Sequence, residues 1–149
     1  KQEEDQIIQR EVATLKKLFA SNPPKVRTKY IKMRTNSKQE KMKEYVLRLL
    51  YCEMLGHEVE FGYVHALTLT QSTNLLEKKV GYLAVSSFLH RDHPLMIMVV
   101  NSFRRDLDSD NFLVVCAALT TMSKLLTPET VPTVVTIVIK LLKHPKLVF

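Results

Sequence analysis

The sequence predicts an all-α fold, a right-handed α-solenoid of stacked helix pairs of the HEAT or armadillo kind. Apolar residues recur at helical spacing along most of the 149 residues, and no segment alternates apolar and polar residues as a strand does. Residues 74–89 are apolar on two faces, which is typical of a helix covered on two sides. Helix-start signals recur, with 34 residues from Pro94 to Pro128 and 37 from Asn74 to Asn111. A repeat of this length, without strand patterning, indicates an α-solenoid.

The helix predicted over residues 74–89 is the one around which the others are arranged. Asn74 is a good N-cap, and Glu77 lies three residues later, as in a capping box. Charge is confined to the first turn, and Gly81 in the middle indicates close approach by a neighbouring backbone. We predict that this helix contributes the following residues to the structural core: Leu76, Val80, Gly81, Leu83, Ala84 and Phe88.

Two amphipathic helices, separated by a basic loop, precede this central helix. The first covers residues 1–20, and its predicted buried side consists of Ile7, Ile8, Val12, Leu15 and Phe19. Asn22-Pro23-Pro24 ends it, and a basic loop follows at residues 22–37. The second helix runs from Ser37 to about Leu55 and is ended by Gly56. Its predicted buried residues are Met42, Tyr45, Val46, Leu49, Leu50 and Met54.

Further helices occupy the rest of the chain. A short one at residues 61–69 precedes the central helix, and His93-Pro94 opens one that runs to about Leu107. Two more are predicted at residues 111–126 and 128–143, and His144-Pro145 begins another. We therefore interpret residues 1–149 as a single fragment of a solenoid that continues beyond residue 149.

The positive charge of the chain lies in one segment. The formal net charge is +7, and between Lys25 and Lys43 eight basic residues face Glu40 alone. Lysine and arginine side chains attract anionic lipid head groups. We predict a membrane or anion contact formed by Lys25, Arg27, Lys29, Lys32, Arg34, Lys38, Lys41, Lys43 and Arg48. A charge run does not identify its ligand, so a solvated loop is the alternative.

The sequence carries no recognisable catalytic or metal-binding pattern. His90-Arg91-Asp92 resembles part of a kinase catalytic loop, but no Asn follows at the required offset and no glycine-rich phosphate loop exists. We predict a protein that is not an enzyme and that takes no cofactor or metal ion. Cys52 and Cys116 lie in apolar helical patterns, so we expect buried, reduced thiols. No uncharged run reaches the ~18 residues that a membrane span needs.

Several short motifs between residues 45 and 115 resemble the amino-terminal trunk of large adaptins. They are Leu55-Gly56-His57 with Phe61-Gly62, then Glu77-Lys78-Lys79-Val80-Gly81-Tyr82-Leu83, then Asp106-Leu107 followed by Asn111. Large adaptins are the alpha, gamma, delta and epsilon chains of heterotetrameric vesicle-coat adaptor complexes. The amino-acid sequence of residues 51–56 and 75–85 is most similar to the epsilon type, which belongs to the fourth adaptor complex.

The resemblance implies a large-subunit trunk that acts in vesicle-mediated protein transport. The implied partners are a small sigma-type chain, the other large adaptin and the medium chain of the complex, an Arf-type GTPase, and an anionic membrane surface. The implied location is cytoplasmic, peripheral on trans-Golgi network or endosomal membranes. The alpha type binds phosphoinositide through consecutive lysines, where this chain has Lys41-Met42-Lys43-Glu44-Tyr45. It reads dileucine signals through an arginine, where this chain has Ile7 with Arg10 one turn away.

Two other functions fit the residues. One is a HEAT-type scaffold unrelated to coats, and binding of a sigma-type chain separates it from an adaptin. The other is a basic helical module that binds nucleic acid, because phosphates attract the same lysines. Tyr30 and Tyr45 provide few aromatic surfaces for base stacking, so we predict no nucleic-acid partner.

Overall fold

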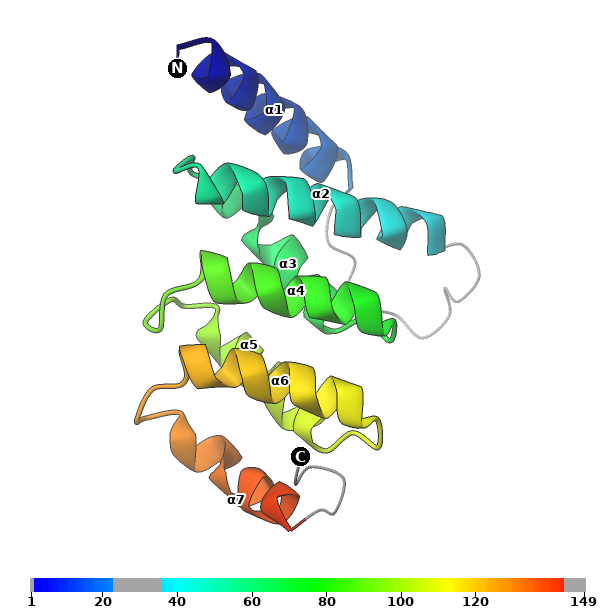
Figure 1. Ribbon diagram of the computed structural model, residues 1–149, viewed down its shortest axis with the longest axis vertical. Helices are drawn as coiled ribbons and strands as arrows, with labels where there is room; N and C mark the ends of the chain where they lie inside the picture. Colours follow the sequence, from blue (N-terminus) through cyan, green and yellow to red (C-terminus); the bar gives the residue numbers. More distant parts are fainter. Residues whose placement is uncertain (1, 23–35, 144–149) are drawn as a thin grey trace.

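The helices of the chain stack in two layers. A computed structural model describes residues 2–22 and 36–143. One layer consists of α2 (Asn36–Met54), α4 (Leu75–Phe88) and α6 (Phe112–Leu125), which run side by side (Figure 1). The other consists of α3 (Tyr63–Thr70), which follows the short 3-10 helix η1 (Glu60–Gly62), with α5 (Met96–Leu107) and α7 (Val131–Leu142). α1 (Gln2–Ser21) lies against α2 at one end of the stack. The prediction of an all-α solenoid is confirmed.

The repeat spacing found in the sequence corresponds to equivalent positions in the stack. The Asn74 side chain accepts a hydrogen bond from the Leu76 amide at 2.9 Å, and the Asn111 side chain accepts one from the Leu113 amide at 3.0 Å. These bonds satisfy amide groups that the first turn of a helix leaves without a partner. α4 and α6 therefore begin at equivalent residues, and each packs against the other within one layer.

Two glycines act as the sequence indicates. Gly56 has a φ of +86°, and the amides of Gly56 and His57 donate to the carbonyl oxygens of Glu53 and Cys52 to close the end of α2. Gly81 lies where α4 crosses the end of α3. A Cβ atom at Gly81 would lie 2.5 Å from the backbone nitrogen of Thr70, so no other residue fits there without a shift of α3.

The core runs between the two layers, and aromatic rings fix α1 to it. Phe19 of α1 is buried, and its ring lies 4.6 Å from the His65 ring and 5.8 Å from the Phe61 ring, centroid to centroid. Burial of Ile7 and Met54 was predicted wrongly, since their side chains are 64% and 76% exposed. Ile7 lies on the terminal helix of the stack, which packs on its neighbours with one side only, and Met54 is the last residue of α2.

Some predictions fall outside the described part of the chain. The helix expected from His144-Pro145 does, and so do residues 23–35 of the predicted basic loop. Within the ranges that are described, Cys52 and Cys116 are both free thiols, the first buried and the second half-buried. No helix there is both long and apolar enough to cross a membrane.

Candidate partner-binding surface

α4 buries two of the charged residues near its start, Glu77 and Lys78, and exposes two of its leucines. Leu76 and Leu83 are 61% and 48% exposed, so the prediction that both belong to the core is wrong. Val80 is half-buried, while Gly81, Ala84 and Phe88 are buried. The buried face of α4 instead includes Glu77, Lys78, Tyr82 and Val85. Hydrophobicity alone selects the wrong face here, because it cannot show that buried charges find partners on other helices.

Lys78 is the centre of a buried cluster that joins three helices. Its ammonium Nζ lies 2.7 Å from Asp106 Oδ2 on α5 and donates, at 2.7 Å, to the backbone carbonyl of Thr70. The Tyr82 hydroxyl donates to the same Asp106 Oδ2 at 2.6 Å. Arg105 Nε approaches Asp106 Oδ1 at 3.2 Å from the solvent side. We call the set Thr70, Lys78, Tyr82, Arg105 and Asp106 the polar junction.

The polar junction is structural. Thr70 is the last residue of α3, so its carbonyl has no partner within the helix, and burial removes water from it. Lys78 satisfies that carbonyl, and Asp106 compensates the charge. Burial, together with the Asp106 carboxylate, raises the pKa of Tyr82 far above its ordinary value, so the phenol keeps its proton and donates it. Both carboxylate oxygens of Asp106 are engaged and the group is buried, which leaves no open position for a substrate.

Glu77 does not bond Asn74 directly, as the predicted capping box would require, because Ser72 lies between them. The Ser72 hydroxyl donates to Glu77 Oε2 at 2.5 Å and accepts from the Asn74 amide at 3.1 Å. Glu77 therefore supports the start of α4 through Ser72. Ser72 and Glu77 are both buried, so this relay fixes the turn between α3 and α4.

The residues predicted to contact a membrane lie in α2 or precede it in the sequence, and Arg48 lies in the second half of α2. Lys41 is exposed and Lys43 is half-buried. Arg48 pairs with Glu11 of α1, with its Nε donating to Glu11 Oε1 at 2.6 Å, and this pair holds α1 on α2. Lys38 belongs to α2, but its side chain is not among those that the structure describes. The described residues also do not include Lys25, Arg27, Lys29, Lys32 and Arg34.

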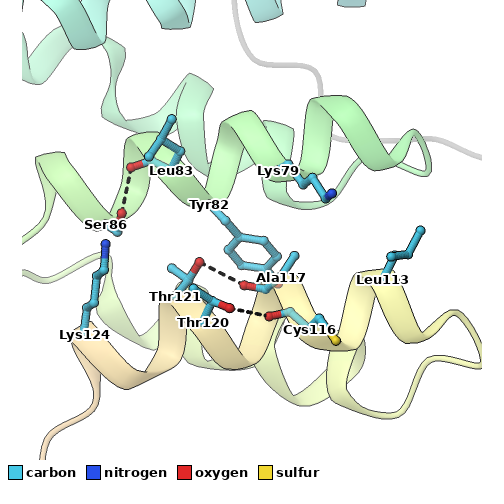
Figure 2. A pocket seen from close by; sticks show the side chains of 10 residues that line it. All are labelled: Lys79, Tyr82, Leu83, Ser86, Leu113, Cys116, Ala117, Thr120, Thr121 and Lys124. Atoms are coloured by element: carbon cyan, nitrogen blue, oxygen red, sulfur yellow. Dashed lines mark hydrogen bonds between the residues drawn. The ribbon is translucent and has the colours of Figure 1, made fainter. Parts of the chain in front are cut away.

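Two shallow grooves lie between helices of the stack. One of about 320 Å³ lies between α4 and α6 and has Lys79 and Lys124 at its ends (Figure 2). The other, about 470 Å³, lies between α1 and α2 and includes Ile7, Leu47 and Tyr51. In the described ranges, no group of three or more His, Cys, Asp or Glu side chains is arranged to hold a metal ion. The surface therefore offers apolar grooves and rows of side chains suited to binding other molecules.

A stacked helical array with such grooves belongs to the class of solenoid binding scaffolds. Residues 5–148 match the family described as the adaptin N terminal region, so the chain belongs to the adaptin family. It is 47% identical over 147 residues to the AP-4 complex subunit epsilon of Arabidopsis thaliana, and 44% identical over 146 residues to the AP-4 complex subunit epsilon-1 of Homo sapiens. Each match covers 98% of the chain, but only 14% and 12% of the respective relatives.

The alpha type matches over less of the chain. The AP-2 complex subunit alpha-2 of Dictyostelium discoideum is 33% identical over 107 residues, which cover 72% of this chain and 10% of that protein. The predicted similarity to the epsilon type is therefore confirmed.

The sequence reasoning missed the polar junction, although three of its residues, Lys78, Tyr82 and Asp106, stood inside the motifs used for the resemblance. Lys78, Tyr82 and Val85 share one helix face, and the placement of Lys78 on that face was the available signal. Asp106 lies near the end of α5, just before the acidic residues Asp108 and Asp110, and its sequence gives no separate sign of burial.

Proposed function

We propose that the chain is part of the trunk of a large adaptor-complex subunit that acts in vesicle-mediated protein transport. It acts by binding and not by catalysis. Its partners are a small sigma-type chain, the other large adaptin and medium chain of the complex, and an Arf-type GTPase. It works in the cytoplasm, peripherally on trans-Golgi network or endosomal membranes. The observation that carries the proposal is the match to epsilon subunits over 98% of the chain, together with an adaptin family match across residues 5–148.

An anionic membrane surface is the second part of the proposal. α2, α4 and α6 run in one direction, so their N-termini lie at the same edge of the stack (Figure 1). Helix N-termini carry partial positive charge. Lys41 and Lys79 are exposed in the first two turns of α2 and α4, and the basic segment of the sequence, residues 25–43, overlaps the start of α2. Arg48 is the weakest member of the proposed contact, because it must leave Glu11 to reach a lipid head group.

The test is co-sedimentation of the chain with liposomes, with and without a GTP-locked Arf-type GTPase, at several salt concentrations and lipid charges. The test variant changes Lys25, Arg27, Lys29, Lys32 and Arg34 to Ser. The matched control changes the same number of described, exposed basic residues elsewhere: Arg10, Lys17, Arg104, Lys140 and Lys143. Both variants carry the same net charge, so a difference between them reports position and not total charge.

We expect GTP-dependent recruitment that anionic lipid strengthens, that salt weakens, and that only the first variant loses. Recruitment that ignores the nucleotide would contradict the Arf part of the proposal. Equal losses in both variants would contradict a local membrane contact and leave total charge as the cause. Co-expression with a sigma-type small chain tests the coat assignment itself, and failure to co-purify would favour a scaffold unrelated to coats.

A further inference from the structure

The groove between α4 and α6 has an apolar surface although several of its lining residues carry hydroxyl groups. Ser86 donates to the Leu83 carbonyl at 2.8 Å, Thr120 to the Cys116 carbonyl at 2.8 Å, and Thr121 to the Ala117 carbonyl at 3.0 Å (Figure 2). Each hydroxyl is therefore engaged with its own helix. The surface of the groove is therefore mainly carbon, and it lies between the side chains of Leu83 and Leu113, which are 48% and 39% exposed.

The shape of the groove favours a helix as its occupant. Both walls are α-helices, whose amide and carbonyl groups bond within the helix, so an extended peptide would find no backbone partners there. A helix satisfies its own backbone and needs only a channel for side chains. Ser86, Ala117 and Thr120 are small, and they leave a hollow between the larger leucines at which side chains of an incoming helix can insert.

The charges of the groove favour an acidic occupant. Lys79 of α4 lies at one end and Lys124 of α6 at the other, and they are the only charged residues that line it. Among the described residues, neither ammonium group is in an ion pair. The groove between α1 and α2 differs, since its charged residues, Glu11 and Arg48, pair with each other. An anionic partner thus gains from the α4–α6 groove and not from the other.

We propose that the α4–α6 groove binds an amphipathic helix of a partner protein, with an apolar stripe that packs on Leu83 and Leu113 and with carboxylates near both ends that face Lys79 and Lys124. The inference stands on this groove alone and does not depend on the coat assignment.

The experiment is a selection from a displayed library of helical peptides of about four turns, in which apolar stripe and terminal charges both vary. The 149-residue chain is the target, and its Leu83→Asp/Leu113→Asp variant is used for counter-selection. Both leucines are exposed, so the variant is expected to fold, which circular dichroism checks. Leu76→Asp is the matched control, because Leu76 is an exposed leucine of the same helix that does not line the groove.

We expect recovered peptides with an apolar stripe and acidic ends. Their affinity should fall about tenfold or more with Leu83→Asp, about fivefold at most with Lys79→Ala or Lys124→Ala, and not at all with Leu76→Asp. Lys79→Glu with Lys124→Glu should abolish binding of the acidic peptide and restore it to a version with lysines at its ends. The proposal would be overturned if the recovered peptides showed no preference for acidic ends, or if Leu83→Asp weakened the binding of none of them.

Discussion

α4 and α6 begin in the same way but pack on their neighbours with different chemistry. Both start at an Asn N-cap, 37 residues apart. In this register Lys78 corresponds to Val115 and Gly81 to Ala118, and all four residues are buried. α4 thus uses a charge and a glycine where α6 uses a valine and an alanine.

The difference follows from how closely each helix approaches the preceding one. At Gly81, α4 approaches the end of α3 so closely that a Cβ atom would meet backbone atoms. This contact covers the Thr70 carbonyl, which α3 leaves without a partner, so donors come from other helices: Lys78 of α4 at 2.7 Å and Arg105 of α5 at 3.4 Å. Ala118 of α6 is fully buried and keeps its methyl group, which shows a less close approach. A buried charge in this fold is the consequence of a helix end that is covered by its neighbour.

The largest effect is expected from Asp106→Leu. This change leaves the Lys78 ammonium buried without its counter-charge and removes the acceptor of the Tyr82 hydroxyl. Removing one partner of a buried ion pair costs about 3–5 kcal/mol in the free energy of unfolding. Urea denaturation measures the change. Val115→Ala at the equivalent position of α6 is the comparison, with an expected loss of about 2 kcal/mol.

A variant without the buried charges of the polar junction tests whether they are needed for stability. Lys78→Met, Tyr82→Phe and Asp106→Leu together remove the buried ion pair and the phenol and keep the volume, while the half-exposed Arg105 keeps its contact with the Thr70 carbonyl at 3.4 Å. We expect this triple variant to unfold within about 2 kcal/mol of the original chain, because paired charges lose in desolvation most of what they gain in attraction. A triple variant as unstable as Asp106→Leu alone would show that the Thr70 carbonyl needs the ammonium group specifically.

Gly81→Ala tests the close approach directly. The new methyl group would lie 2.5 Å from Thr70 N and 2.8 Å from the Leu69 carbonyl carbon, both backbone atoms that cannot rotate away. Despite the better helix propensity of Ala, we expect a loss of about 1–3 kcal/mol in the free energy of unfolding. The reciprocal change, Ala118→Gly, should cost about 1 kcal/mol through propensity and the lost methyl group. A neutral or stabilising Gly81→Ala would contradict the close packing of α4 on α3.

The N-caps of α4 and α6 differ in their surroundings, and we expect smaller stability effects from changing them. Asn74→Ala and Asn111→Ala each remove a bond to the second amide of the helix, which is worth about 1 kcal/mol. The Ser72–Glu77 bond lies beside Asn74, and we therefore expect Ser72→Ala to destabilise α4 further, by about 1–2 kcal/mol, because it leaves the buried Glu77 carboxylate short of a donor. Thermal unfolding followed by circular dichroism measures all three. Equal values for Ser72→Ala and for the exposed Ser123→Ala would contradict this role.

Helix positions were predictable from the sequence because they depend on local signals. Asn74, Asn111 and Gly56 set helix ends by bonds within a few residues of themselves, and the structure places the ends there. The family was also recognisable, because it shows in short motifs of consecutive residues. The lengths of repeats followed from the same capping residues.

The buried face of α4 was not predictable in the same way. Leu76 and Lys78 both lie in the first turns of α4, and hydrophobicity favours the burial of Leu76 over that of Lys78. The actual arrangement depends on Asp106, 28 residues away, and on a backbone carbonyl that no side-chain pattern reveals. The candidate grooves are likewise formed by pairs of helices whose separation only the packed structure fixes.

The opposite side of α3 is held by a neutral buried group, and pH distinguishes it from the charged polar junction. His65 is buried, and its Nε2–H donates to the Asn22 carbonyl at 3.0 Å at the end of α1. Burial lowers the pKa of His65, against the opposing effect of its hydrogen bond to the Asn22 carbonyl. Below pH 6.5, about the ordinary pKa of histidine, His65 binds a proton in the unfolded chain but stays neutral in the folded chain. The stability contributed by neutral His65 is therefore fully present above that pH and is lost as pH falls through it.

We expect urea midpoints to fall as the pH is lowered from about 7.5 to about 5.5, and to fall less in His65→Gln, which keeps a donor but cannot titrate. Other titrating groups cancel in the comparison of the two proteins. If the urea midpoint changes with pH equally in both, His65 has the same protonation state in the folded and the unfolded chain, which would contradict this role.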